Sequence, residues 1–287
     1  MFRRFAIPSL LSVLHIGAST LTVMWISFTM AIVTSSSKSS TVSWARCISV
    51  NHSVSQDFIQ RVKSPCSQST GQTGIEANCS RRNIQVLTAD WFPCDLQKLS
   101  LEGNSLLVLR NTSFAHLLQL RWLSVRNNRI ERIEQSTFEN LVHLEYLNLE
   151  YNQLKLSSES YPPGLFSPLT QLKTLRLAHQ RSEHLSSSYP EDFIFNVSGL
   201  HALSIPTLGE ILHFGPEFCQ LKDLSRLEIS GSVRVIRNSS FDGLTCLTLV
   251  ELSIHELPYL SAFELDSLNP LRNSLRLFHM DNVPVGL

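Results

Sequence analysis

The chain has 287 residues, of which 43% are hydrophobic and 17% are charged, so it contains enough apolar material for a sizeable core. Its 24 lysines and arginines balance its 24 aspartates and glutamates. This balance argues against a general nucleic-acid binder, because such a protein carries a basic excess that neutralises phosphates.

The N-terminal residues have the pattern of a secretory signal. Arg3 and Arg4 precede an uncharged stretch from Phe5 to Ser37, and a positive start followed by an apolar run is typical of signal peptides. The stretch is also long enough to act as an uncleaved membrane anchor. We expect residues 1–36 to be a cleaved signal peptide, and the signal anchor is the alternative.

Glycosylation motifs agree with entry into the secretory pathway. Five Asn-x-Ser/Thr sequons occur, at Asn51, Asn78, Asn111, Asn196 and Asn238. Each is a candidate glycan site in a secreted protein. We therefore expect a secreted protein, or one on the extracellular or endosomal lumenal face of a membrane.

The N-terminal segment, residues 37–95, contains a cluster of cysteines. Its members are Cys47, Cys66, Cys79 and Cys94, and no two cysteines of the chain form a Cys-x-x-Cys pair. This spacing favours disulfides over a metal site. We expect a disulfide-stapled cap in which Cys66 pairs with Cys79 and Cys47 with Cys94, although four cysteines allow three connectivities.

An internal repeat follows the cysteine cluster. The segments LQKLSLEGNSL, LRWLSVRNNRI and LEYLNLEYNQL begin at Leu96, Leu120 and Leu144, 24 residues apart. Degenerate copies begin at Leu172, Leu200, Leu224, Leu249 and Leu275, and a frame from Leu247 also fits the seventh copy. Residues 96–287 therefore form about eight leucine-rich repeats, the last of them truncated.

The repeat pattern predicts a strand followed by a bend. Leu147 and Leu149 alternate with polar neighbours, which is strand periodicity. One coil cannot bury its leucines alone, so stacked coils must share a continuous core. We expect Asn152 to turn inward and satisfy backbone groups at the bend, because buried backbone groups need partners.

A second motif predicts the return side of each coil. F-x-x-L-x-x-L begins at Phe114, Phe138, Phe166 and Phe218, with helical or 3₁₀ spacing. The predicted fold is an α/β leucine-rich-repeat solenoid, a horseshoe with parallel strands on its concave face. Short helical or 3₁₀ segments would form the convex face, and stacked phenylalanines would fill that half of the core.

Two other features leave alternatives open. Tyr161-Pro162 and Tyr189-Pro190 occupy the same position in two lengthened repeats. The insertion predicts either a binding ledge away from the strand face or a solvated loop. Cys219 and Cys246 lie one repeat apart, so they form either a disulfide between neighbouring coils or two buried free thiols.

The sequence contains no motif for catalysis or cofactor binding. The G-x-S-x-G, H-E-x-x-H, phosphate-loop and dinucleotide patterns do not occur, so we expect no enzyme activity and no cofactor. No histidine spacing predicts a metal site. His255 and His279 fall on outward strand positions, where they either titrate together near endosomal pH or are ordinary surface residues.

The outward strand positions of the first repeats supply a candidate ligand-binding patch. Its residues are Trp122, Arg126, Tyr146, Asn148 and Glu150. Tryptophan, tyrosine and arginine dominate binding hot spots. The alternative is that the cap or glycans cover the aromatic side chains.

The signal, the cysteine cap with ANCSRRNIQVL, the F-x-x-L-x-x-L segments and the sequons resemble the N-terminal ectodomain portion of a Toll-like receptor. The resemblance covers residues 47–287. It implies an innate immune receptor that binds a protein or microbial ligand on the solenoid surface and forms a homodimer.

Signalling by such a receptor would need a transmembrane helix and a cytoplasmic domain beyond Leu287, so we expect a fragment or a short form. Contact with a membrane would then come only from the N-terminal apolar segment or from a C-terminal span that this sequence lacks. The alternative function is a secreted or extracellular-matrix repeat protein that binds a protein partner without signalling.

Overall fold

The computed structural model describes residues 64–71, 74–181, 189, 193, 194, 196, 197, 199–207 and 209–284. The predicted signal segment, Cys47 and Asn51 lie outside these residues. Within the described part of the chain, no helix has the length and apolar character needed to cross a bilayer.

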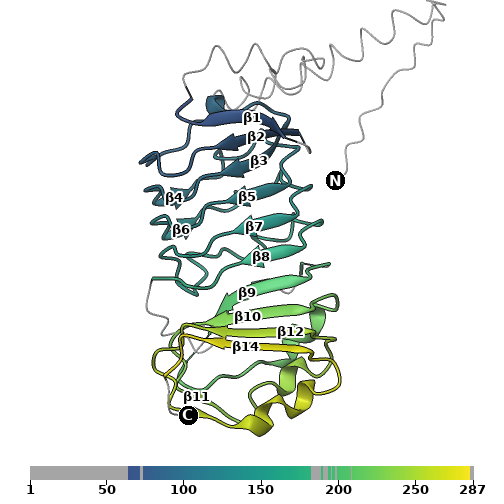
Figure 1. Cartoon of the computed structure of the whole chain (residues 1–287). Coiled ribbons are helices and arrows are strands. Elements are labelled where there is room, and N and C mark those ends of the chain that lie inside the picture. Colours follow the sequence, from purple (N-terminus) through teal and green to yellow (C-terminus); the bar gives the residue numbers. More distant parts are fainter. Residues whose placement is uncertain are drawn as a thin grey trace, which may run out of the picture. The chain divides into compact units, whose positions relative to one another are not determined.

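A ten-stranded sheet runs through the repeats. Its strands lie in the order β1-β2-β3-β5-β7-β8-β9-β10-β12-β14 (Figure 1). Their bounds are β1 Ser67–Gly71, β2 Gly74–Asn78, β3 Leu96–Ser100, β5 Trp122–Ser124, β7 Tyr146–Asn148, β8 Thr174–Arg176, β9 Ala202–Pro206, β10 Arg226–Ser230, β12 Glu251–His255 and β14 Leu277–Asp281. Only β1 and β2 pair antiparallel, and every other neighbouring pair in this sheet is parallel.

The opposite side of each coil is built from turns and short elements. Two small parallel pairs join β4 (Val108–Leu109) to β6 (Arg132–Ile133) and β11 (Val235–Ile236) to β13 (Ala262–Phe263). The helices assigned in the described residues are all 3₁₀: η1 Ala89–Trp91, η2 Pro216–Gln220, η3 Asp242–Leu244 and η4 Leu265–Leu271. The predicted solenoid, with parallel strands on one side and 3₁₀ segments on the other, is confirmed.

The strand register settles the frame of the seventh repeat. Leu227 pairs with Leu252, and Leu252 pairs with Phe278. Leu252 is fully buried and stands three residues after Leu249, so the frame that begins at Leu249 is correct.

A ladder of side-chain amides closes the bends after the strands of four consecutive coils, from Asn104 to Gln180. Asn128 donates from Nδ2 to the carbonyl oxygens of Leu101 and Val125, at 3.0 and 2.9 Å. Its Oδ1 accepts from the Leu106 amide of the preceding coil at 3.1 Å. Asn104 and Asn152 make equivalent bonds. One side chain therefore satisfies backbone groups of two coils that water cannot reach.

Gln180 takes over this role in the fourth repeat, where the asparagine is absent. Its Nε2 donates to the carbonyl oxygens of Leu177 and Leu149 at 2.7 and 3.0 Å, and its Oε1 accepts from the Leu154 amide at 3.2 Å. The extra methylene group is accommodated, and the ladder continues through a residue that departs from the repeat pattern.

Stacked phenylalanines fill the other half of the core. The ring centroids of Phe114 and Phe138 lie 6.4 Å apart, and those of Phe138 and Phe166 lie 6.0 Å apart, with nearly parallel planes. Tyr161 belongs to the same column, because it is 1% exposed and packs edge-on against Phe193 at 4.9 Å. Its ring fills space that the longer coil creates, whereas Ser158, Glu159 and Pro163 of the same insertion are exposed, so the ledge and the solvated loop both stay predictions.

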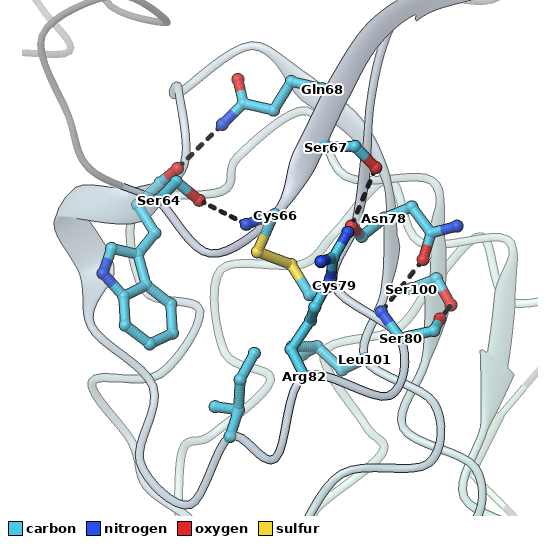
Figure 2. The surroundings of a disulfide bond; sticks show 12 residues. Ser64, Cys66, Ser67, Gln68, Asn78, Cys79, Ser80, Arg82, Ser100 and Leu101 are labelled. Atoms are coloured by element: carbon cyan, nitrogen blue, oxygen red, sulfur yellow. Dashed lines mark hydrogen bonds between the residues drawn. A yellow bond between two sulfur atoms is a disulfide. The ribbon is translucent and has the colours of Figure 1, made fainter.

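Two disulfides staple the described solenoid. Cys66, just before β1, and Cys79, just after β2, form a disulfide across the open end of the hairpin, beside the bond between the hydroxyls of Ser80 and Ser100 (Figure 2). Cys94 is also disulfide-bonded, and its pairing with Cys47 stays a prediction. Cys219 and Cys246 form a disulfide between neighbouring coils, which excludes the alternative of two buried free thiols.

Replacing Asn128 with alanine should lower the free energy of unfolding by at least about 2 kcal/mol, because a buried amide and two carbonyls lose a partner that water cannot replace. Denaturant unfolding followed by circular dichroism would measure the loss. Gln135 is the control, since it is exposed and its change to alanine should cost no more than about 0.5 kcal/mol. Equal losses in the two variants would contradict the ladder.

Candidate functional site

The outer face of the ten-stranded sheet, here called the strand face, carries an aromatic stack. Trp122 and Tyr146 are register partners on β5 and β7, and their rings stack with centroids 5.1 Å apart and planes 7° apart. Both side chains are half-buried. Lys98 lies on the next strand with its Nζ 5.2 Å from the Trp122 ring centroid, so a cation borders the stack.

A buried carboxylate on the strand face, that of Glu150, binds side chains of neighbouring coils. Glu150 is 2% exposed. Its Oε1 accepts from Arg176 Nε at 2.9 Å and from Ser204 Oγ at 3.0 Å, and its Oε2 lies 3.7 Å from Arg126 Nε. A buried charge is costly unless it is paired and hydrogen-bonded, and these contacts fulfil both conditions.

Two of the predicted ligand contacts must be corrected. Asn148 and Glu150 are 4% and 2% exposed. Arg126, Arg176 and Ser204 of neighbouring coils contact Glu150. Asn148 Oδ1 accepts from the Glu150 amide at 2.9 Å, and Glu150 anchors two guanidinium groups. These two residues therefore position their neighbours. The predicted patch residues whose side chains remain accessible to a ligand are Trp122, Tyr146 and Arg126.

His179 is a site residue that the sequence pattern did not reveal. Its ring stacks on the Tyr151 ring with centroids 4.7 Å apart. The Arg126 guanidinium also lies over the Tyr151 ring, 4.6 Å from its centroid. Tyr151 and His179 stand just before Asn152 and Gln180 in their repeats. Extending the outward positions by one residue along each repeat would have identified both.

His179 links two carboxylates from later coils. Its Nδ1 lies 2.8 Å from Glu256 Oε2, and its Nε2 lies 3.3 Å from Glu228 Oε1. Burial by itself lowers the pKa of His179, but the hydrogen bond to Glu228 and the charge of Glu256 outweigh it and raise the pKa above its usual value. Burial raises the pKa of Glu228, whereas His179 and Arg176 lower it, and the net shift is downward.

Glu150, His179 and Glu228 place three metal-ligand atoms within 4.8 Å of one another. The Arg176 guanidinium already lies between the two carboxylates, with Nε 2.9 Å from Glu150 and Nη2 3.0 Å from Glu228. A protein cation thus supplies the positive charge that these carboxylates need, and the cluster forms an ion-pair network.

His255 and His279 each have a separate acidic neighbour. His255 Nδ1 lies 3.3 Å from Asp281 Oδ2, and His279 Nε2 lies 4.0 Å from Glu251 Oε1. The register pairs His279 with Ser253 and His255 with Asp281, so the two histidines are offset by two positions along the strands.

Three hollows border these groups, and the one of about 490 Å³ is lined by the network itself, between Arg126, His179 and Asp281. Two others extend away from it. One, of about 320 Å³, opens on the strand face where β9 carries the small side chains of Ala202 and Ser204, between Tyr146 and Glu251. The other, of about 890 Å³, follows the turns beyond the strands between Tyr151 and Tyr259. Ser232 lines this last hollow at the repeat position where asparagine closes the earlier coils.

The four described sequon asparagines, Asn78, Asn111, Asn196 and Asn238, are all exposed. Asn51 lies outside the described residues. Occupancy of the five sites stays a prediction.

Comparison with protein-family models matches residues 94–154 and 119–181 to the leucine rich repeat family. These matches cover the repeats with the intact asparagine and the repeat that carries Gln180. The chain therefore has the leucine-rich-repeat fold. Comparison with curated proteins finds no match.

A solved structure extends the likeness beyond the matched repeats. The crystal structure of human 5T4 (Wnt-activated inhibitory factor 1, trophoblast glycoprotein) is 25% identical to this leucine-rich-repeat chain, with a TM-score of 0.58. The alignment covers 78% of this chain and 82% of that one. Leucine-rich-repeat solenoids are typically interaction scaffolds, and their stacked coils present extended binding surfaces.

Replacing His179 with glutamine should flatten the pH dependence of stability between about pH 6 and about pH 8. The folded pKa of His179 is raised, so its stabilising contribution is complete below the unfolded pKa and is lost as pH rises through the folded pKa. Wild-type protein should therefore lose more stability than the variant over this range, as measured by thermal unfolding. Identical slopes for the two proteins would contradict the network.

Proposed function

We propose that the chain is an extracellular binding module that holds a protein ligand on its strand face. The stack of Trp122 on Tyr146 is the observation that carries this proposal. Both rings are half-buried, with one part fixed by neighbours and another part open to a partner. Rigid aromatic side chains of this kind contribute most of the binding energy at protein interfaces.

The ion pairs beside the aromatic stack hold side chains of the proposed binding surface in place before a ligand binds. Arg126 is exposed, yet Glu150 and the Tyr151 ring hold its guanidinium in place. A side chain that is already ordered loses less entropy on binding. A ligand with an acidic group near an apolar one would match Arg126 and the aromatic stack together.

An extracellular location agrees with three observations. The described cysteines are disulfide-bonded, and disulfides persist in oxidising compartments. The described sequon asparagines are exposed, and the structurally similar 5T4 bears the name trophoblast glycoprotein.

The narrower form of this proposal is the ligand-binding ectodomain of a Toll-like receptor. The cysteine cap, the stacked phenylalanines and the repeat length agree with it. The competing form is a secreted or matrix protein that binds a partner without signalling, and the likeness to 5T4 favours that form.

Changing Trp122 or Tyr146 to serine should weaken ligand binding by roughly 30-fold or more, because each change removes a hot-spot aromatic worth about 2 kcal/mol. Secreted protein would first be screened against arrays of extracellular proteins and microbial products. Surface plasmon resonance would then measure the affinity of the ligand so found for each variant.

Val142→Ser is the control for these variants, because Val142 is 41% exposed and lies outside the strand face. It should leave the affinity unchanged. Full affinity in both aromatic variants, or unfolding of both, would exclude the stack as the binding surface.

A chimera separates the two forms of the proposal. Residues 37–287 would be joined to the transmembrane and signalling segments of a Toll-like receptor and expressed in reporter cells. The receptor form predicts a reporter response to microbial products, which Trp122→Ser abolishes. Binding of a host protein without any reporter response would favour the non-signalling form.

A further inference from the structure

Two sequons occupy the same position in different coils. The Arg110 and Arg237 amides donate to Ser113 Oγ at 3.0 Å and Ser240 Oγ at 2.9 Å. The Asn111 amide donates to Glu134 Oε2 at 3.1 Å, and the Asn238 amide donates to Glu264 Oε2 at 2.8 Å. Both asparagines therefore sit in one local structure, repeated along one edge of the solenoid.

Hydrogen bonds show which residue of the next coil lies beside each asparagine. The β4–β6 pairing ends at Leu109 and Ile133, and beyond it the Asn111 amide reaches the carboxylate of Glu134. The β11–β13 pairing ends at Ile236 and Phe263, and beyond it the Asn238 amide reaches the carboxylate of Glu264. Each asparagine therefore contacts the residue that immediately precedes Gln135 or Leu265 in the chain.

The two neighbours differ in polarity. Leu265 is 79% exposed, more than any other large hydrophobic residue in the described part of the chain. Gln135 is exposed but polar, with its Nε2 donating to the Pro163 carbonyl at 3.3 Å. The same edge thus presents a sequon beside an unprotected leucine in one coil and a sequon beside a glutamine in another.

We infer that Asn238 carries an N-linked glycan whose first sugar residues cover Leu265. The C–H faces of pyranose rings supply apolar contact, and their hydroxyls remain in water. In the transfer, the amide nitrogen displaces the pyrophosphate of a lipid-linked oligosaccharide from the anomeric carbon. A C–N bond forms, the C–O bond to pyrophosphate breaks and the amide proton is lost.

The sequon hydroxyl limits when this transfer takes place. Ser240 is 1% exposed, and its Oγ donates to the Leu212 carbonyl at 2.7 Å. Recognition of a sequon requires its hydroxyl, so the glycan must be added before this coil closes. The inference rests on the proposed extracellular location, since the transfer occurs in the secretory pathway.

Secreted full-length protein from mammalian cells would test the inference. Mass spectrometry after endoglycosidase digestion would measure occupancy at each sequon, and size-exclusion chromatography would measure the aggregated fraction. Asn238→Gln should raise that fraction roughly threefold or more by exposing an apolar surface. Asn111→Gln should leave it unchanged, and Asn238→Gln combined with Leu265→Gln should return it to the wild-type level.

The outcomes separate this inference from the proposed function. Occupancy of Asn111 or Asn78 with an unmodified Asn238 would overturn the inference and leave the extracellular location standing. An absence of glycan at every sequon would overturn both. Equal aggregation of the Asn238→Gln and Asn111→Gln variants, or failure of the Leu265 change to restore solubility, would show that the glycan does not cover this leucine.

Discussion

Each coil of this protein can bury its leucines only against the coils on either side of it. Leu123, for example, lies between Leu99 and Leu147 in the strand register, and all three are fully buried. The sharp bend that ends each strand would leave backbone amides and carbonyls inside this dry core. In the coils from Asn104 to Gln180 the side-chain amides satisfy these groups, so the apolar stack and the amides depend on each other. Gln180 makes the same hydrogen bonds, so the position requires a side-chain amide that reaches these backbone groups and does not require asparagine itself.

The same stacking assembles the strand face. Parallel register places residues 24 to 28 positions apart beside one another, as with Trp122 and Tyr146 or Tyr151 and His179. The ion-pair network reaches further, because Arg176 contacts Glu150 on one side and Glu228 on the other. Polar side chains on adjacent coils bury Glu150, while part of the Trp122 and Tyr146 rings and the Arg126 side chain stay accessible.

The two edges of the coils differ from the strand face in chemical character. Where the ladder residue becomes Ser232, the turns leave a hollow between Tyr151 and Tyr259. On the opposite side of the coils, the disulfide between Cys219 and Cys246 ties η2 to the turn after η3, and the Tyr161 ring fills the lengthened coil. Residues that depart from the repeat pattern are therefore buried in the core in some coils, as Tyr161 is, and line a surface hollow in others, as Ser232 does.

The repeat pattern predicts the solenoid, its strand register up to the ambiguity at Leu249, the phenylalanine column and the inward asparagines. Each of these features follows from a short periodic pattern, because the spacing of residues within one repeat decides which side chains face the core. The folded coils were needed to reveal that Glu150 and Asn148 are buried. They also show that His179 contacts Glu228 and Glu256 and that the Asn238 amide bonds to Glu264. Burial and ion pairing depend on side chains from several coils at once, and their separations along the chain carry no periodic signal.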